Sequence, residues 1–493
     1  MWLEKSRENI AMLAVLALFV LSYFVFFPQF YSSSDECHTL ANALQIQKGS
    51  LGEKNPENVC NAGSFTSNGY VYGQGIGRAL FTIPFTWFGF GAVMLSGLVL
   101  HLLNFGLLFL ILKKLKARQS FALLYLFYPV IFWQSRTLYD GPLVLAGFFA
   151  AFYFFLSEKR RDWVLSGAFF GLAMLARNDA VLGISAILLA LLFKDRKKFS
   201  LTLAGFLPVL AAMLLFNSIA YGGALSTGYG ESASEQIIST FLGAEPLSLL
   251  FYVALLLAVY PLMLAAPHLS KKFPYKLEFA LFSLVYLFLA ARYPPFAFNN
   301  SIFTILLRMR YALPLAGMLL IPYGAFLQEL LEKFKSREKL LLAGYWAIIV
   351  VLFAGSIYAS AVHLDFLNGR KAVFDQIYSH TPENALVIGG SDDCIYFMNG
   401  IFPARRYLSV DLNQQLAGNP ENLSLGDFIG SNTYVMDLQY SNRIQGSGGR
   451  QDTTDQERAK VLEFIEKNRA SLELVFETNL PHSLKIYKWV QTK

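Results

Sequence analysis

Long apolar runs separated by short polar segments recur from residue 10 to residue 360. The first run, Ile10 to Phe30, is long enough to cross a hydrocarbon core about 30 Å thick. No cleavage site of small residues follows it, so we expect an anchor helix rather than a removed signal peptide. Ten further apolar stretches lie near 79–112, 119–135, 141–157, 163–176, 180–193, 199–221, 247–267, 277–291, 311–330 and 340–360. The pattern predicts a polytopic all-α membrane bundle of about eleven transmembrane helices.

The apolar pattern ends near residue 360, and the tail has the pattern of a small soluble domain. Short β-like runs at 385–388, 434–438, 472–476 and 484–489 alternate with helical patterns at 369–380 and 455–470. We therefore predict a transmembrane domain over residues 1–360, whose first outside loop covers about 31–78. A small α/β domain is predicted over residues 361–493.

Basic residues are unevenly shared between the loops, and this asymmetry predicts the orientation. With a cytoplasmic N-terminus, the inside segments carry twenty Lys and Arg residues and the outside loops eight. Such a bias is typical of cytoplasmic loops, and an odd number of spans then places residues 361–493 outside the cytoplasm. The net charge of +7 does not indicate a nucleic-acid partner, because the charges form no basic face. The 55% hydrophobic content agrees with an integral membrane protein.

Carboxylates gather at the outer ends of the predicted spans. Asp35 and Glu36 directly follow the first span, Asp140 lies in the second outside loop and Asp179 in the third. Each has an ordinary structural interpretation: Asp35 as a helix cap, Asp140 as the start of a turn, Asp179 as a partner of Arg177. Because all four converge on one membrane face, we predict a functional site there.

Arginines accompany these carboxylates. The spans on either side of Arg177 are short, so this residue is expected below the membrane surface, facing protein or a watery cavity. Arg308 and Arg310, followed by Tyr311, enter the tenth span from outside. A guanidinium binds phosphate with two parallel hydrogen bonds, so this cluster suits a lipid phosphate. General contact with lipid headgroups is the alternative.

All three cysteines, Cys37, Cys60 and Cys394, fall on the predicted outer side, where disulfides persist. Cys37 and Cys60 share the first outside loop and could form a bridge there. The spacing alone fixes nothing about the geometry that a disulfide needs.

The order of these motifs resembles the GT-C class of membrane glycosyltransferases, in particular the protein O-mannosyltransferase and RgtA-type branch. Asp35-Glu36-Cys37-His38 resembles that branch's Asp-Glu-x-His motif, and Asp140 occupies the place of its second acidic residue. The segment ending at Arg177 and the sequence Arg310-Tyr311-Ala-Leu-Pro314 resemble two further family motifs. One departure is the absence of a Pro-Pro pair at the end of the first outside loop.

The resemblance implies transfer of a sugar from a polyprenyl- or dolichyl-phosphate donor to a hydroxyl acceptor on a protein, glycan or lipid. Asp35 would be the general base of an inverting reaction. Glu36 and Asp140 would orient hydroxyl groups, or hold a divalent cation if one is used. The substrate and lipid phosphate would be bound by His38, Arg177, Asp179, Arg308, Arg310 and Tyr311. No other cofactor is implied.

Two other classes of protein share part of this pattern. A lipid or glycan flippase or transporter also has many helices, but its ionisable groups usually lie near the middle of the membrane. In this sequence they crowd one face, which favours an enzyme. A non-catalytic assembly subunit whose outer domain binds a partner is the third possibility, and the presence of Asp35 and Asp140 argues against it only mildly.

Overall fold

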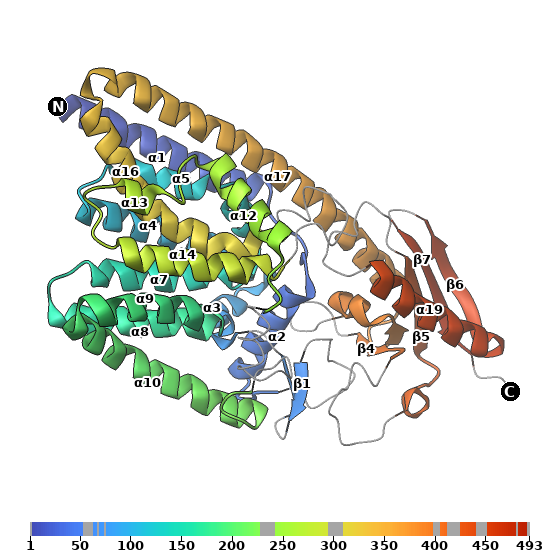
Figure 1. Ribbon diagram of the computed structural model, residues 1–493. Coiled ribbons are helices and arrows are strands. Elements are labelled where there is room, and N and C mark those ends of the chain that lie inside the picture. Colours follow the sequence, from blue (N-terminus) through green and yellow to red (C-terminus); the bar gives the residue numbers. More distant parts are fainter. Residues whose placement is uncertain are drawn as a thin grey trace.

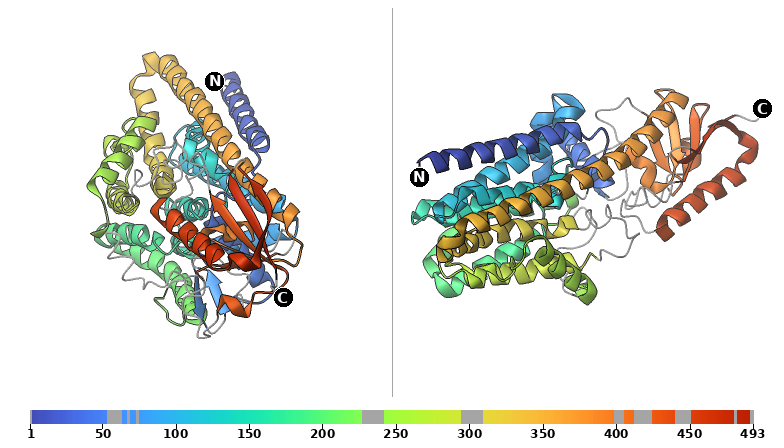
Figure 2. Two further views of the ribbon diagram at one scale, coloured as in Figure 1. Left: turned by 90° about the vertical axis from the view of Figure 1, so that its right-hand side faces the viewer. Right: turned by 90° about the horizontal axis from the view of Figure 1, so that it is seen from above.

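The computed structural model describes residues 2–52, 63–66, 69–72, 75–226, 242–293, 309–397, 405–411, 424–439, 451–479 and 482–490. A bundle of helices forms one end of the molecule, and a smaller domain containing a sheet forms the other (Figure 1). The N-terminus lies at the end of the bundle farthest from the sheet, and the chain ends beside the sheet (Figures 1 and 2). The predicted combination of a helical bundle and a C-terminal α/β domain is confirmed.

Within the described residues, each of the eleven predicted apolar stretches contains helix. Four helices are long and apolar enough to cross a membrane alone, namely Gly89–Lys114, Arg196–Tyr221, Arg310–Lys333 and Lys335–His380. The bundle elements are α1 (Trp2–Val25), α3 (Ile76–Thr86), α4 (Gly89–Lys114), η2 (Gln119–Ala122), α5 (Leu123–Leu126), α6 (Pro129–Gln134), α7 (Gly141–Phe155), α8 (Arg160–Ala176), α9 (Ala180–Lys194), α10 (Arg196–Tyr221), α12 (Pro246–Val259), α13 (Ala266–Leu269), α14 (Lys276–Ala291), η3 (Arg310–Ala312), α16 (Leu313–Lys333) and α17 (Glu338–His380).

Three predicted spans are interrupted. The stretch 119–135 consists of η2, α5 and α6, with Pro129 at the first position of α6. Its side chains are buried in the main core, where neighbouring protein can satisfy an irregular backbone at membrane depth. The stretch 247–267 is divided into α12 and α13, because Pro261 cannot continue a helix and Leu262 has a φ of 67°. The stretch 79–112 is divided at Gly89, whose φ is 82°.

The C-terminal domain is built on a five-stranded sheet of order β4-β3-β5-β7-β6. The strands β4, β3 and β5 are parallel, while β7 runs antiparallel to both β5 and β6. Four of the strands were predicted, whereas β4 was not. The elements are β3 (Leu386–Gly389), β4 (Arg406–Ser409), β5 (Thr433–Gln439), α19 (Gln451–Lys467), β6 (Leu472–Thr478) and β7 (Ser483–Trp489).

Helix α17 connects the two parts of the molecule. It has 43 residues and passes the predicted domain boundary at residue 360 without a break. The helix predicted at 369–380 is its outer end.

A second hydrophobic core joins the segment after α1 to the C-terminal domain, since the Phe30 ring lies 5.8 Å from that of Tyr396 and 5.5 Å from that of Phe374. The C-terminal domain therefore packs against the bundle through a shared hydrophobic core, in addition to its covalent connection through α17.

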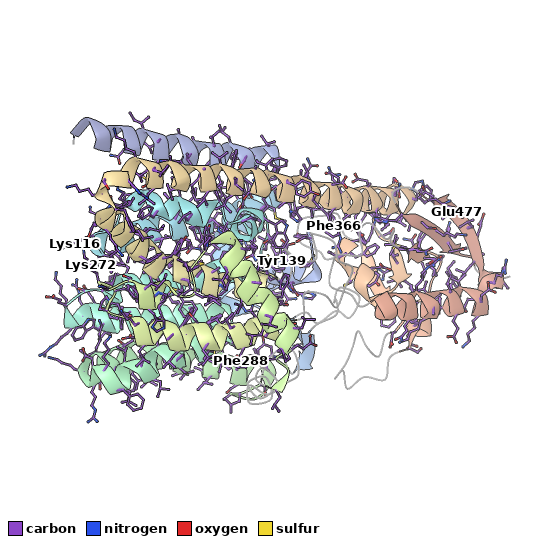
Figure 3. The ribbon with its side chains drawn as sticks, turned by 45° about the horizontal axis from the view of Figure 1, so that its top comes forward. Lys116, Tyr139, Lys272, Phe288, Phe366 and Glu477 are labelled. Atoms are coloured by element: carbon purple, nitrogen blue, oxygen red, sulfur yellow. The ribbon has the colours of Figure 1, made fainter. Side chains whose placement is uncertain are left out.

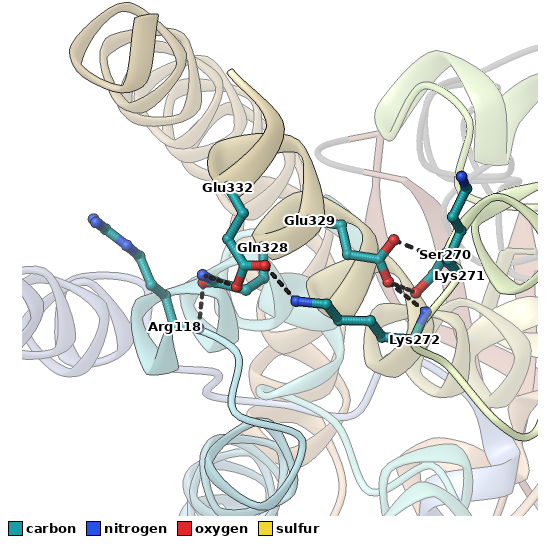
Figure 4. Close-up of polar contacts among 7 residues, drawn as sticks. All are labelled: Arg118, Ser270, Lys271, Lys272, Gln328, Glu329 and Glu332. Carbon is teal, nitrogen blue, oxygen red and sulfur yellow. Dashed lines mark hydrogen bonds and ion pairs between the residues drawn. The ribbon is translucent and has the colours of Figure 1, made fainter. Parts of the chain in front are cut away.

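The end of the bundle opposite the sheet carries the basic loops. Lys116 and Lys272 lie at that end, whereas Tyr139 lies toward the C-terminal domain (Figure 3). Glu329 of α16 accepts hydrogen bonds there from the backbone N–H groups of Lys271 and Lys272, at 2.9 and 2.8 Å (Figure 4). These contacts join one loop to a helix at the end predicted to be cytoplasmic.

Candidate functional site

Asp35 lies in the first turn of α2 (Ser34–Gln47), the short helix that follows α1. The N-cap of α2 is Ser33, so Asp35 does not cap this helix. Its carboxylate Oδ2 lies 3.0 Å from Nη2 of Arg310, and the Asp35 side chain is 32% exposed. Two motifs from opposite ends of the bundle sequence therefore meet in one ion pair, and its carboxylate is open to a ligand.

Glu36 faces the protein interior and is 1% exposed. Its Oε1 accepts a hydrogen bond from the backbone N–H of Leu138 at 2.8 Å, and Oε2 accepts one from that of Ser32 at 2.6 Å. Burial raises the pKa of Glu36, and the hydrogen bonds from Ser32 and Leu138 oppose this shift. Glu36 thus joins the start of α2 to the second outside loop.

Asp140 ends that second loop, immediately before α7. Its Oδ1 is enclosed and makes no hydrogen bond with the described residues. Burial raises the pKa of Asp140 to about 7, while the positive charges of Arg177 and Arg78 act in the opposite direction. Asp35 is close enough to add to the rise. The structure therefore brings Asp140 near Asp35, within electrostatic reach of Arg177, Arg78 and Arg310.

The guanidinium of Arg310 is held by aromatic residues. Its Nη2 donates to the Tyr311 hydroxyl at 2.9 Å, and its Cζ lies 4.3 Å from the ring centre of Tyr139. Its Nη1 is enclosed and makes no hydrogen bond with the described residues. This nitrogen is a free donor next to the Asp35 carboxylate, as an oxyanion site requires.

Arg177 and Asp179 pair with each other, with Nε 3.1 Å from Oδ1, as the ordinary interpretation of Asp179 predicted. Arg177 Cζ also lies 5.4 Å from the ring of Tyr311, which stacks on Tyr293 at 3.6 Å. These four side chains line a small cavity together with Val144, Tyr286, Leu289 and Pro314. Arg177 thus faces a cavity within the protein, while its predicted depth below the membrane surface stays a prediction.

Arg78 is a site residue that was not predicted. It lies on α3, is fully buried, and donates to the Leu138 carbonyl at 3.3 Å and the Ser96 hydroxyl at 3.0 Å. Its Nη1 is enclosed without a hydrogen bond among the described residues, and its charge reaches Asp140 and Glu36. The sequence did offer a signal for Arg78, because it is a charged residue directly before the apolar stretch 79–112.

Two other predicted binding residues are less informative. His38 is fully buried on α2, and burial lowers its pKa to about 4, so the imidazole is neutral near pH 7. Arg308 lies outside the described residues. The phosphate contacts expected of both remain predictions.

The predicted Cys37–Cys60 disulfide is wrong. Cys37 is a free cysteine, whereas Cys394 in the C-terminal domain is disulfide-bonded. The thiol of Cys37 is 2% exposed and turns inward from α2, with Sγ 3.7 Å from the carbonyl oxygen of Ser33. It is packed in the core between α2 and the C-terminal domain, which explains why sharing a loop did not produce a bridge. Cys60 lies outside the described residues.

A divalent cation finds few ligands among the described residues. No group of three His, Cys, Asp or Glu side chains lies together there. The Asp35 carboxylate is paired with Arg310, and Asp140 is close to Arg177 and Arg78. Both carboxylates thus lie near arginines, and among the described residues this donor set does not fit a metal.

A helical bundle with an acidic motif on a short helix after its first apolar helix, followed by a small C-terminal domain, is the arrangement that the resemblance to the GT-C class of membrane glycosyltransferases implied. Residues 79–221 match the sequence model of the family described as dolichyl-phosphate-mannose-protein mannosyltransferase. No curated protein matches the chain in sequence.

Solved structures confirm the fold. ArnT from Cupriavidus metallidurans bound to undecaprenyl phosphate is 11% identical, with a TM-score of 0.63 over 96% of this chain and 97% of that one. The apo form of the same protein gives a TM-score of 0.59, with 11% identity over 97% of this chain and 98% of that one. The Archaeoglobus fulgidus oligosaccharyltransferase in complex with Zn and sulfate is 13% identical, with a TM-score of 0.52 over 87% of this chain and 67% of that one.

Proposed function

We propose that this chain is an integral membrane glycosyltransferase that moves a sugar from a polyprenyl-phosphate donor to a hydroxyl acceptor. The observation that carries the proposal is the Asp35–Arg310 ion pair, in which a partly exposed carboxylate lies beside a guanidinium with one free nitrogen. The first group can accept a proton and the second can bind a phosphate oxygen. Sugar transfer from a lipid phosphate needs both at one place.

The proposed reaction is a single displacement with inversion at the anomeric carbon. The acceptor hydroxyl gives its proton to Asp35 while its oxygen attacks that carbon. The bond from the anomeric carbon to the phosphate oxygen breaks, and polyprenyl phosphate leaves without needing a proton. Arg310 stabilises the charge that develops on the phosphate, and Arg177, which also contacts the ring of Tyr311, assists it.

The other predicted acids take different tasks in this proposal. Glu36 positions rather than reacts, because both its oxygens are occupied by protein donors in a buried environment. Asp140 has an enclosed free oxygen near Asp35 and would orient a hydroxyl of the sugar or of the acceptor. Arg78 would hold the loop that carries Asp140, through its bond to Leu138.

One of the similar solved structures supports a lipid-linked donor, because it contains ArnT bound to undecaprenyl phosphate. We infer a polyprenyl- or dolichyl-phosphate hexose as donor here, and a protein, glycan or lipid hydroxyl as acceptor. The described residues favour arginine over a divalent cation as the partner of the leaving phosphate.

The proposed orientation follows from the basic loops at the end of the bundle opposite the sheet (Figure 3). The N-terminus would face the cytoplasm, and the site and the C-terminal domain would lie on the outer side of the cell membrane. A transporter should instead have its ionisable groups midway along the bundle, open to both sides. The crowding of Asp35, Asp140 and three arginines at one end favours the enzyme, whereas a non-catalytic subunit would not need the Asp35 carboxylate.

The decisive experiment is the substitution Asp35→Asn. The donor is first identified by mass spectrometry as the polyprenyl-linked sugar that accumulates in cells lacking the protein. With that donor at saturation, purified Asp35→Asn should lose turnover by about 10²- to 10⁴-fold, because asparagine cannot accept the proton. Thermal unfolding and donor binding should stay at wild-type values.

A matched control for this experiment is Asp375→Asn. Asp375 is an exposed aspartate on α17, and its Oδ2 lies 2.7 Å from Nζ of Lys371. It has no role in the proposed reaction. It should turn over at the wild-type rate. Turnover near wild type in Asp35→Asn itself would eliminate the general-base assignment, and unchanged lipid-linked sugars in the deletion strain would eliminate the proposed activity.

A further inference from the structure

Arg370 on α17 is an almost completely enclosed cation, with 5% of its surface exposed. Its Nε and Nη1 are buried and have no hydrogen-bond partner among the described residues. The one contact shown for its guanidinium is with the ring of Phe366, 4.7 Å from Cζ. Phe366 lies near Tyr139, where the bundle meets the outer domain (Figure 3). An enclosed charge without a partner is costly, so such a group usually has a ligand.

Arg405 in the same domain shows the ordinary arrangement. It is also 5% exposed and also faces a ring, with Cζ 4.3 Å from that of Tyr378. Its Nη2, however, donates to the carbonyl oxygens of Thr381 at 2.7 Å and Tyr378 at 3.0 Å. The chain therefore satisfies one buried guanidinium of this junction and leaves another, Arg370, with free donors.

The charge of Arg370 reaches Cys37 on α2, His363 on α17 and His482 just before β7. Burial raises the pKa of the Cys37 thiol well above its usual value, so the thiol stays uncharged. Burial, with a contribution from Arg370, lowers the pKa of His482 to about 4, so this imidazole is neutral near pH 7. The charge of Arg136 also reaches His363, and the charges of Glu36 and Asp35 reach Cys37.

From these contacts we propose that Arg370 forms an oxyanion-binding site, for a phosphate group, at the junction of α2, α17 and the C-terminal domain. The guanidinium offers two enclosed N–H donors, Nε and Nη1, and each can donate to an oxygen of a phosphate group. The negative charge would offset that of the buried guanidinium.

This site is separate from the proposed donor phosphate site. Arg370 lies on α17 and faces the Cys37 side of α2, whereas Arg310 pairs with Asp35 in the first turn of α2. The proposal does not depend on glycosyl transfer, because it rests on the burial and free donors of Arg370 alone. The phosphate can come from a free ion or from the headgroup of an anionic lipid, and both sources offer the same oxygens to the guanidinium.

The test compares Arg370→Met with Arg405→Met in the full-length protein, by thermal unfolding in nanodiscs of zwitterionic lipid. In chloride buffer, Arg405→Met should lower the Tm by about 2 °C or more because it removes hydrogen bonds, whereas Arg370→Met removes none and should not lower it. Inorganic phosphate at matched ionic strength should then raise the Tm of the wild type and of Arg405→Met. It should not raise that of Arg370→Met to the same extent.

Two further arms make the result specific. In Arg310→Ala, the rise in Tm caused by phosphate should be smaller than in the wild type, because binding at the donor site is lost. Adding Arg370→Met to that variant should remove the rest of the rise. Nanodiscs containing anionic phospholipid replace free phosphate in a parallel series, and a stabilisation seen only there identifies a headgroup as the source. An equal response of wild type and Arg370→Met in both series would overturn the proposal, as would a loss of Tm in Arg370→Met equal to that of Arg405→Met.

Discussion

The guanidinium of Arg310 contacts both the Asp35 carboxylate and the Tyr311 hydroxyl. We expect Arg310→Ala to weaken binding of the lipid-linked donor by about 1.5–3 kcal/mol, the usual contribution of a hydrogen bond to a charged group. Arg310→Lys should lose less, because the charge remains and only the planar fork is lost. Donor affinity measured by titration into nanodiscs decides this, since turnover also depends on Asp35. Unchanged affinity in Arg310→Ala would remove the residue from the phosphate site.

Glu36 should respond to substitution in the opposite way to Asp35. In Glu36→Gln, an amide NH₂ replaces one acceptor oxygen, so a buried N–H of Ser32 or Leu138 loses its partner. We expect a loss of about 1–3 kcal/mol of stability. The folded protein should keep most of its turnover. Calorimetry measures the effect on stability and the activity assay measures the effect on turnover. A large loss of turnover at unchanged stability would make Glu36 a reacting group.

Most residues of the candidate site could be predicted from the sequence, as could the pairing of Arg177 with Asp179, but the pairing of Asp35 with Arg310 could not. Asp35, Asp140, Arg177 and Arg310 stood out because each is ionisable and lies at the outer end of an apolar span. The pairing of Asp35 with Arg310 depends on how α2 packs against η3, which no local pattern encodes. The task of Glu36 had a local signal, since Ser33 and Glu36 have the spacing of a capping box.

Helices α3 and α8 approach each other closely where the site is built. A Cβ added to Gly75 would lie 1.9 Å from the carbonyl oxygen of Ala176, the residue before Arg177. Gly75→Ala should therefore push α3 away from α8 and displace both Arg78 and Arg177. We expect a large loss of activity and a lower Tm, measured on the purified protein.

Gly106 provides the control for this prediction. It lies within α4, and a Cβ added there would meet nothing within 4 Å. Gly106→Ala should be neutral, or should stabilise the helix by about 0.5–1 kcal/mol. Equal effects of Gly75→Ala and Gly106→Ala would show that the absence of a side chain at residue 75 is not required for α3 to pack on α8.

Elements were predicted well where the local pattern is strong and poorly where tertiary contacts decide. Apolar runs identified the helices, yet Pro129 and Pro261 mark two of the interruptions that run length alone did not show. Strand β4 has only four residues and its strand form depends on pairing with β3, so its own pattern was too short to indicate it.

At the scale of the whole molecule, the orientation in the membrane is the first property to test. A reporter fused after Lys493 should be non-cytoplasmic, whereas one inserted at residues 194–198 should be cytoplasmic, because basic loops stay inside. Protease or alkylation protection in intact cells measures both. The same location for both reporters would contradict the proposed orientation, although the fold would stand.

The boundary at residue 360 was placed where the composition changes, from apolar to mixed. Composition reports what surrounds a helix, lipid or water, and not where the helix ends. In the structure α17 continues to His380, so the change of surroundings falls within one element.

Because α17 is continuous, a tilt of its membrane part would also move its outer end. Its 43 residues correspond to a rod of about 65 Å, and the helix contains no Pro, the commonest cause of a sharp bend. If the membrane part tilted by ~5°, an outer arm of ~30 Å would swing by roughly 3 Å, close to the length of a hydrogen bond. Tilting is one way in which a spanning helix adapts to a change in bilayer thickness, and a tilt of α17 would move the junction that holds α2.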